Sequence, residues 1–290
     1  MSRANRLRVR AAAIAAAAAL ACVVTGAPAQ AAGAPASAGA SPPAGAPATS
    51  GAPTSGRPAA TAPITTGTLP PVRVGSAIVG APTDRVAWTA RIVAIAEVRA
   101  APDVKSKPRS RVSPAGEWNG GVVKLLVLGS AVSPDGREWL HVLLPDRPNT
   151  NTGWISDDVV ALGRTAWRVV IDLHSRRGSA YDAGRLVRSW PVVIGKHATP
   201  TPRGLFAVYE RVRQPDDSDL GPWALHITAH SRVLFDYGGG PGRVALHGRR
   251  FDLLADPLGS ATSHGCVRMD NSIVSWLAAR VDSGTPVLIR

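Results

Sequence analysis

Cys266, which follows a histidine and a glycine, is the first candidate for chemistry in this sequence. A thiol is mostly protonated near pH 7 and must lose its proton before it attacks a carbonyl. His247 and His264 flank the loop that ends at Cys266, and a neutral imidazole within hydrogen-bond reach could take that proton. The backbone N–H groups of Gly265 and Cys266 are candidate oxyanion donors, and Arg268 could hold a substrate carboxylate. These residue types favour a cysteine acyltransferase.

The N-terminus indicates that Cys266 has no disulfide partner in the mature chain. Arginines, an apolar run and an A-x-A pattern are typical of a secretory signal peptide, which we assign to residues 1–31. The other cysteine, Cys22, lies within it, and an odd cysteine in an exported protein is either an intermolecular link or a reactive thiol. Two alternatives are an uncleaved N-terminal anchor and a lipoprotein that uses Cys22. Beyond the signal peptide we expect no stable membrane span.

Composition predicts a protein that works among anionic polymers outside the cell. Residues 32–84 are rich in Ala, Pro, Gly, Ser and Thr, which predicts a disordered, flexible linker. The formal net charge is +13, and the arginines are scattered rather than gathered in a basic stripe. This distribution argues against nucleic acid and favours anionic cell-wall polymers as partners. We therefore expect a secreted, extracytoplasmic, cell-wall-associated protein.

Two mainly β domains are predicted after the linker. Residues 85–163 contain short apolar runs separated by polar turns, such as Ser-Pro-Asp-Gly at 133–136, which predicts a small β-barrel. Residues 165–290 predict a second β domain, with a hairpin that turns at 182–184 and one of its strands at 232–237. Residues 270–284 predict its helix, with polar N-cap candidates at 270–272 and Gly284 after the end.

The first of these domains resembles the bacterial SH3-like domain. The resemblance rests on three stretches: "VRAAPD" (98–103), "GREWLHV" (136–142) and "TGWISDDVV" (152–160). It implies a module that binds peptidoglycan or acts as a spacer. Trp118, Trp139 and Trp154 could be binding residues or barrel core, and we predict a core position for at least Trp154.

The second domain resembles the YkuD-type L,D-transpeptidases. The chain has "HG" at 247–248 and "SHGCVRM" at 263–269. Fifteen residues, 248–262, lie between His247 and Ser263, and this spacing is similar to the family signature. "TPTPRGLF" at 199–206 is similar to another segment of the family. The resemblance implies a β-sandwich with one or more short helices.

The resemblance also implies an activity on peptidoglycan stem peptides. The cysteine attacks the carbonyl of the third residue, a diamino acid, and D-alanine leaves. The side-chain amine of another stem then resolves the thioester as a 3→3 cross-link. By position, Cys266 is the nucleophile and His247 the general base. The other motif residues shape the site and its oxyanion donors (Ser263, His264, Gly265) or bind substrate (Arg268, Gly248). No cofactor is implied.

Four alternatives remain open from the sequence. Water could resolve the same thioester, which would make the protein an L,D-carboxypeptidase. A zinc ion could use His247, His264 and Cys266, although no carboxylate stands ready as base, and we expect no metal. "ATSHG" at 261–265 is a relative of the serine-hydrolase elbow, but loop residues precede it where a strand is needed. A non-catalytic wall-binding protein would not need the cysteine.

Overall fold

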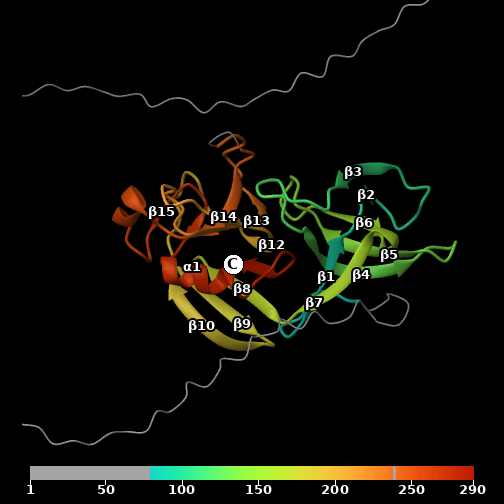
Figure 1. Ribbon diagram of the computed structural model, residues 1–290, viewed down its shortest axis with the longest axis horizontal. Coiled ribbons are helices and arrows are strands. Elements are labelled where there is room, and N and C mark those ends of the chain that lie inside the picture. Colours follow the sequence, from blue (N-terminus) through green and yellow to red (C-terminus); the bar gives the residue numbers. More distant parts are fainter. Residues whose placement is uncertain (1–78, 238–239) are drawn as a thin grey trace, which may run out of the picture. The chain divides into compact units, whose positions relative to one another are not determined.

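The computed structural model describes residues 79–237 and 240–290, which fold mainly as β structure with one α-helix (Figure 1). The predicted signal peptide at 1–31 lies outside the described residues, as does the predicted linker at 32–84 apart from its last six positions. Among the residues described, no helix has the length and apolar character needed to cross a membrane.

The first sheet, which we call the N-terminal sheet, has seven antiparallel strands in the order β3-β2-β6-β5-β4-β1-β7. Its strands are β1 (Ala87–Ile92), β2 (Ala96–Arg99), β3 (Pro108–Val112), β4 (Lys124–Val132), β5 (Glu138–Leu143), β6 (Thr152–Ser156) and β7 (Val160–Thr165), with the 3-10 turn η2 (Asp157–Val159) before β7. The turn predicted at 133–136 joins β4 to β5, where Gly136 takes a positive φ. Whether this sheet is an SH3-like domain stays a prediction.

Packing in the N-terminal sheet differs from the prediction for its tryptophans. Trp139 is buried and its indole N–H donates to Ser133 Oγ at 3.0 Å. Trp154 is only half-buried and stacks on His141, because it sits on the face of β6 that does not point into the core. Trp118 is 40% exposed. The prediction of a core position was therefore wrong for Trp154.

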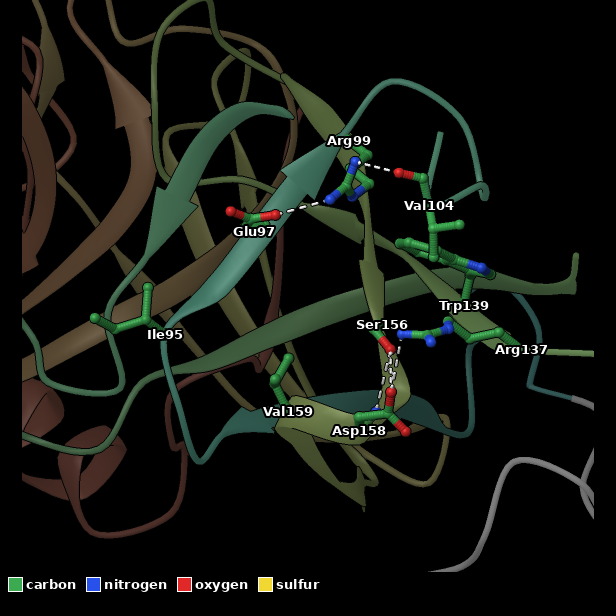
Figure 2. Close-up of a pocket in the computed structure, with 9 residues that line it drawn as sticks. All are labelled: Ile95, Glu97, Arg99, Val104, Arg137, Trp139, Ser156, Asp158 and Val159. Atoms are coloured by element: carbon green, nitrogen blue, oxygen red, sulfur yellow. Dashed lines mark hydrogen bonds and ion pairs between the residues drawn. The ribbon is translucent and has the colours of Figure 1, made fainter. Parts of the chain in front are cut away.

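A small cavity of about 180 Å³ opens on the N-terminal sheet beside the Trp139 ring (Figure 2). Its charged side chains pair with one another, Arg99 with Glu97 and Arg137 with Asp158. No uncompensated charge faces this cavity from the residues that line it.

The second sheet has eight strands in the order β10-β9-β8-β17-β12-β13-β14-β16, and β11 and β15 form a separate parallel pair. The strands are β8 (Trp167–Asp172), β9 (Arg177–Asp182), β10 (Arg185–Pro191), β11 (Ile194–Gly195), β12 (Gly204–Arg213), β13 (Trp223–His230), β14 (Arg243–His247), β15 (Ala261–Ser263), β16 (Val267–Arg268) and β17 (Pro286–Ile289), with the 3-10 turn η3 (Phe251–Ala255) after β14. The predicted hairpin is confirmed, because Ala183 and Gly184 both take positive φ between β9 and β10.

The helix α1 (Asn271–Ala278) packs on the core of the second sheet, and it confirms the predicted helix but ends at Ala278, before the expected stop at Gly284. Asp270 is its N-cap and accepts the Ser272 N–H. The apolar face of α1 packs into the core through Ile273, Val274 and Leu277. This helix closely follows β16, so burial of the helix also anchors residues 264–266, the loop that precedes this short strand.

The strand predicted at 232–237 does not form. These residues bend away from the sheet after β13, and only an isolated bridge joins Tyr237 to Gly240. The Ser231 hydroxyl accepts the N–H groups of Val233 and Leu234, which turns the chain locally. The apolar side chains that suggested a strand are exposed, with Phe235 at 68%.

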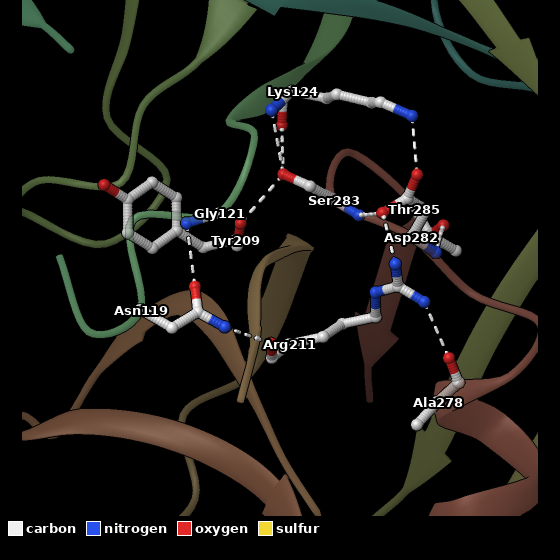
Figure 3. A network of polar contacts seen from close by, with 9 residues as sticks. All are labelled: Asn119, Gly121, Lys124, Tyr209, Arg211, Ala278, Asp282, Ser283 and Thr285. Atoms are coloured by element: carbon white, nitrogen blue, oxygen red, sulfur yellow. Dashed lines mark hydrogen bonds and ion pairs between the residues drawn. The ribbon is translucent and has the colours of Figure 1, made fainter. Parts of the chain in front are cut away.

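The two sheets pack as one compact unit. Tyr209 of β12 lies in the core of the N-terminal sheet, and the buried Glu210 carboxylate accepts the backbone N–H groups of Trp118 and Asn119. Figure 3 shows a further network, in which Asp282 pairs with Lys124 and Arg211. A buried carboxylate needs such donors, so the N-terminal sheet completes the polar contacts of β12.

Candidate active site

The parallel pair β14 and β16 places His247 beside Cys266. Leu246 pairs with Val267, and both side chains are fully buried in the core. Residues next to them on each strand point to the opposite face. His247 and Cys266 therefore share that face, one residue to either side of the pair. The Ala245 N–H reaches Cys266 Sγ at 3.5 Å.

Both side chains line one cavity of about 320 Å³. Its walls come from distant parts of the sequence: Ser218, Asp219, Leu220, Tyr237, His247, Leu253, His264, Cys266 and Arg268. Four of the seven residues predicted for the site are among them, namely His247, His264, Cys266 and Arg268.

The ring of His247 is held as a neutral base. Its Nδ1 lies 2.7 Å from the Gly248 carbonyl, which can only accept, so Nδ1 carries the proton and Nε2 is left as the acceptor. The pKa of His247 is lowered to about 4, chiefly by burial and in part by the charge of Arg268, against the opposing carbonyls of Gly248 and Leu220. At neutral pH the ring can therefore accept a proton.

His247 belongs to a group that we call the buried histidines. In each of them burial is the largest cause that lowers the pKa, in each case to about 4: His226, His230 and His247. A neutral imidazole avoids the desolvation penalty of a buried charge. All three rings are therefore uncharged in the folded protein at neutral pH.

The thiol of Cys266 is also neutral at rest. Burial raises its pKa, while the Ala245 N–H and the positive charge of Arg268 act in the opposite direction. Cys266 forms no disulfide with any residue that the structure describes. A neutral thiol beside a neutral imidazole is suited to general-base catalysis, in which the proton moves as the sulfur attacks.

Ser263 holds the loop that carries the cysteine. Its hydroxyl donates to the Cys266 carbonyl at 2.6 Å and accepts the Gly265 N–H at 3.1 Å. Gly265 has a φ of +120°, which an L side chain rarely adopts. Ser263 is fully buried, so its hydroxyl braces the loop. The serine-hydrolase alternative requires this hydroxyl to attack a substrate, and it is not placed to do so.

Two threonines of the segment at 199–206 hold the same loop from the other side. Thr201 donates to the Gly265 carbonyl at 2.9 Å and accepts the Gly195 N–H at 2.8 Å. Thr199 donates to the Ser263 carbonyl at 3.1 Å. The resemblance to the family singled out this segment, but no local pattern assigns these hydroxyls to the site, because their partners lie more than sixty positions away.

The two predicted oxyanion donors differ in whether their N–H groups are already hydrogen-bonded. The Gly265 N–H is already bonded to Ser263 Oγ. Within residues 79–237 and 240–290, the Cys266 N–H donates to no intramolecular acceptor. The Cys266 amide is therefore the donor available to a tetrahedral intermediate on the same residue.

Arg268 and Gly248 were both expected to face substrate. The structure places Arg268 at the cavity and Gly248 away from it. Arg268 lines the cavity, but it is 7% exposed and its guanidinium forms an ion pair with Asp256. Gly248 is buried behind His247, where a Cβ would overlap Oδ1 of Asn271. Its carbonyl orients the His247 ring, so its contribution is to position the base.

His264 lies at the exposed edge of the cavity. Its Nδ1 is 3.4 Å from the hydroxyl of Tyr237, a residue that the sequence did not single out. The zinc alternative is not supported by this arrangement: in the described part of the chain, no three His, Cys, Asp or Glu side chains gather closely enough to hold a metal ion.

Comparison with known proteins identifies the fold that carries this site. A family model described as the L,D-transpeptidase catalytic domain, YkuD, matches residues 166–289. A protein of Bacillus licheniformis named as an L,D-transpeptidase, YkuD, is 30% identical over 166 residues, which cover 55% of this chain and 91% of the relative. The chain belongs to the YkuD family of L,D-transpeptidases. Its second sheet is thus the catalytic domain of an acyltransferase family that acts on peptidoglycan stem peptides.

Other relatives of this L,D-transpeptidase match it over different shares of the chain. The protein of the same name from Bacillus subtilis is 33% identical over 105 residues, 36% of this chain and 54% of the relative. A solved L,D-transpeptidase from Mycobacterium tuberculosis is 17% identical, covers 58% of this chain and 90% of its own, and has a TM-score of 0.37. The catalytic domain of the Enterococcus faecium enzyme is 24% identical, with coverages of 43% and 96% and a TM-score of 0.34. The assignment rests on the family model and the first relative.

Proposed function

We propose that this L,D-transpeptidase is exported and forms 3→3 cross-links in peptidoglycan through a thioester on Cys266, with His247 as the general base. One observation carries the proposal: His247 and Cys266 face the same cavity, and the bond from Nδ1 to the Gly248 carbonyl leaves Nε2 as the acceptor. The remaining donors and charges fit the two steps of acyl transfer.

In the first step, Nε2 of His247 takes the thiol proton as Sγ attacks the carbonyl carbon of the third stem residue. The Cys266 N–H donates to the oxyanion that forms. The peptide C–N bond then breaks, and the departing D-alanine takes the proton from His247. The product is a thioester, and no cofactor or metal enters the step.

In the second step, the side-chain amine of another stem attacks the thioester carbonyl. His247 takes a proton from the amine and returns it to the sulfur as the C–S bond breaks. The cross-link is released and the neutral thiol is restored. Arg268 is offset by Asp256, so it orients a substrate carboxylate through hydrogen bonds more than through net charge.

The rest of the chain supports the proposed location. The signal peptide at 1–31 would export the protein, and the linker at 32–84 would let the folded part reach stems across the wall. We assign 85–163 to an SH3-like domain and 165–290 to the catalytic domain. The strongly basic composition supports retention by anionic wall polymers.

The test is incubation of the mature protein, and of Cys266→Ala, with a purified disaccharide tetrapeptide, followed by mass spectrometry. A Cys266-dependent dimer that has lost one D-alanine supports the transpeptidase. A Cys266-dependent tripeptide alone supports the L,D-carboxypeptidase. If neither product forms, and if both proteins bind isolated wall material equally, the protein is a non-catalytic wall binder and the proposal fails.

A further inference from the structure

One wall of the cavity is formed by a segment that the second sheet does not hold. After β13 the chain leaves the sheet, and Tyr237 reaches the cavity with its side chain 53% exposed. Its hydroxyl lies 3.4 Å from Nδ1 of His264. We call residues 231–237, together with 240–242, the Tyr237 segment.

The contacts within the Tyr237 segment satisfy its N–H groups better than its carbonyls. The Ser231 N–H donates to the Gly242 carbonyl at 2.8 Å, and the Ser231 hydroxyl accepts two further N–H groups. These bonds leave the carbonyls of Ser231, Leu234 and Pro241 in need of a donor.

That donor is a single side chain of the N-terminal sheet. Arg147, between β5 and β6, donates from Nη1 to Ser231 O at 2.7 Å. Its Nη2 donates to Leu234 O at 3.0 Å and to Pro241 O at 2.9 Å. The guanidinium also lies 4.5 Å from the centre of the Phe235 ring. In the described residues, all of its hydrogen-bond partners are carbonyls of this segment.

The surrounding residues are arranged for this contact. Gly242 has a φ of +64°, and a Cβ there would overlap the Leu234 carbonyl. Asn149, two residues after Arg147, binds both the N–H and the carbonyl of His230, at the end of β13. The N-terminal sheet thus holds the segment at positions from Ser231 to Pro241.

We propose that Arg147 is a positioning residue for the transpeptidase site: by bridging the carbonyls of Ser231, Leu234 and Pro241, it holds Tyr237 as one wall of the cavity that contains Cys266. The inference rests on the proposed function, because it assigns the cavity to substrate. It makes the N-terminal sheet part of substrate binding, in addition to any role in wall attachment.

The consequence is selective. Cys266 and His247 are held by β14, β16 and the Ser263 loop, none of which contacts Arg147 through a hydrogen bond. Loss of the guanidinium should therefore leave the reactivity of the thiol intact while it weakens substrate binding. Lysine keeps the charge but lacks the planar fork, so it should restore only part of the effect.

The experiment compares Arg147→Met with Lys124→Met, a matched control that removes another cation at the contact between the sheets, at Asp282. For Arg147→Met we expect kcat/KM for the disaccharide tetrapeptide to fall about tenfold, mainly through KM. Alkylation of Cys266 by iodoacetamide should stay within about twofold of the parent rate. Hydrogen exchange at 231–237 should become faster. Lys124→Met should show none of these changes, and Arg147→Lys should lie between.

A double variant tests whether Arg147 acts through Tyr237. If it does, Arg147→Met combined with Tyr237→Ala should have about the same kcat/KM as the less active of the two single variants. Fully additive losses, or a kcat/KM for Arg147→Met equal to that of Lys124→Met, would overturn the inference. If the parent does not turn over the tetrapeptide, the proposed function fails, and hydrogen exchange still decides: unchanged exchange at 231–237 overturns the role of Arg147, and faster exchange supports it.

Discussion

Removal of the Ser263 hydroxyl should damage both the stability of the protein and its chemistry. Ser263→Ala leaves the Cys266 carbonyl and the Gly265 N–H without their partner in a fully buried position. Each unpaired buried group costs about 1–3 kcal/mol. Because the loop can relax toward the cavity, we expect a loss of about 2–4 kcal/mol in the free energy of unfolding. In a fold of this size that lowers Tm by roughly 5–15 °C.

The same substitution should slow acylation of the thiol. The hydroxyl fixes the peptide group that follows Cys266 and the one that precedes Gly265, and misplacement of a nucleophile by about 1 Å costs about 100-fold in rate. We would measure Tm by calorimetry and the rate of carbapenem adduct formation by intact-mass spectrometry. The control is Ser260→Ala, since among the described residues the Ser260 hydroxyl bonds only the exposed Thr262 hydroxyl. An unchanged Tm together with the parent acylation rate would refute the assignment of Ser263 as the brace of the loop.

Three further predictions concern the base and its support. His247→Ala should keep the fold but abolish carbapenem acylation of Cys266, and an adduct formed at the parent rate would mean that another group is the base. Acidification from pH 6.5 toward 4 should lower the free energy of unfolding measured in urea, because the buried histidines stay neutral while the unfolded chain takes up protons. Above pH 6.5 these histidines should not make the free energy of unfolding depend on pH. A free energy of unfolding that stays constant below pH 6.5 would contradict their burial as neutral rings. Gly248→Ala should lower Tm and activity together, because its Cβ would overlap the Asn271 side chain, whereas Gly129→Ala, where a Cβ meets nothing within 4 Å, should change neither; equal Tm values would show that the site is not tightly packed.

The sequence predicted those features whose cause is local. The helix after β16 follows from a polar N-cap at Asp270 and an apolar face, and both are present. The hairpin at 182–184 follows from Gly184, which tolerates positive φ, although Ala183 takes a positive φ as well. Cys266 and His247 could be named from their types and motif spacing, and the parallel pairing of β14 with β16 brings them to one face.

Features that depend on distant partners could not be predicted in this way. Arg268 was expected to hold a substrate carboxylate, but nothing in the motif indicates that Asp256 forms an ion pair with it. The apolar residues at 232–237 fit a strand, yet the segment is bent because Ser231 and Arg147 take up its polar groups. Arg147 lies 84 positions from Ser231, beyond the reach of any local pattern.

Glu210 has a consequence for how this architecture can change in evolution. Its carboxylate is buried and takes both of its backbone donors, Trp118 and Asn119, from the N-terminal sheet. A catalytic domain cut at the family boundary would keep the acid and lose the donors. The two halves of the chain therefore cannot be exchanged independently. A lineage that exchanges its N-terminal module must replace Glu210 in the same event or supply a new pair of backbone amides for its carboxylate.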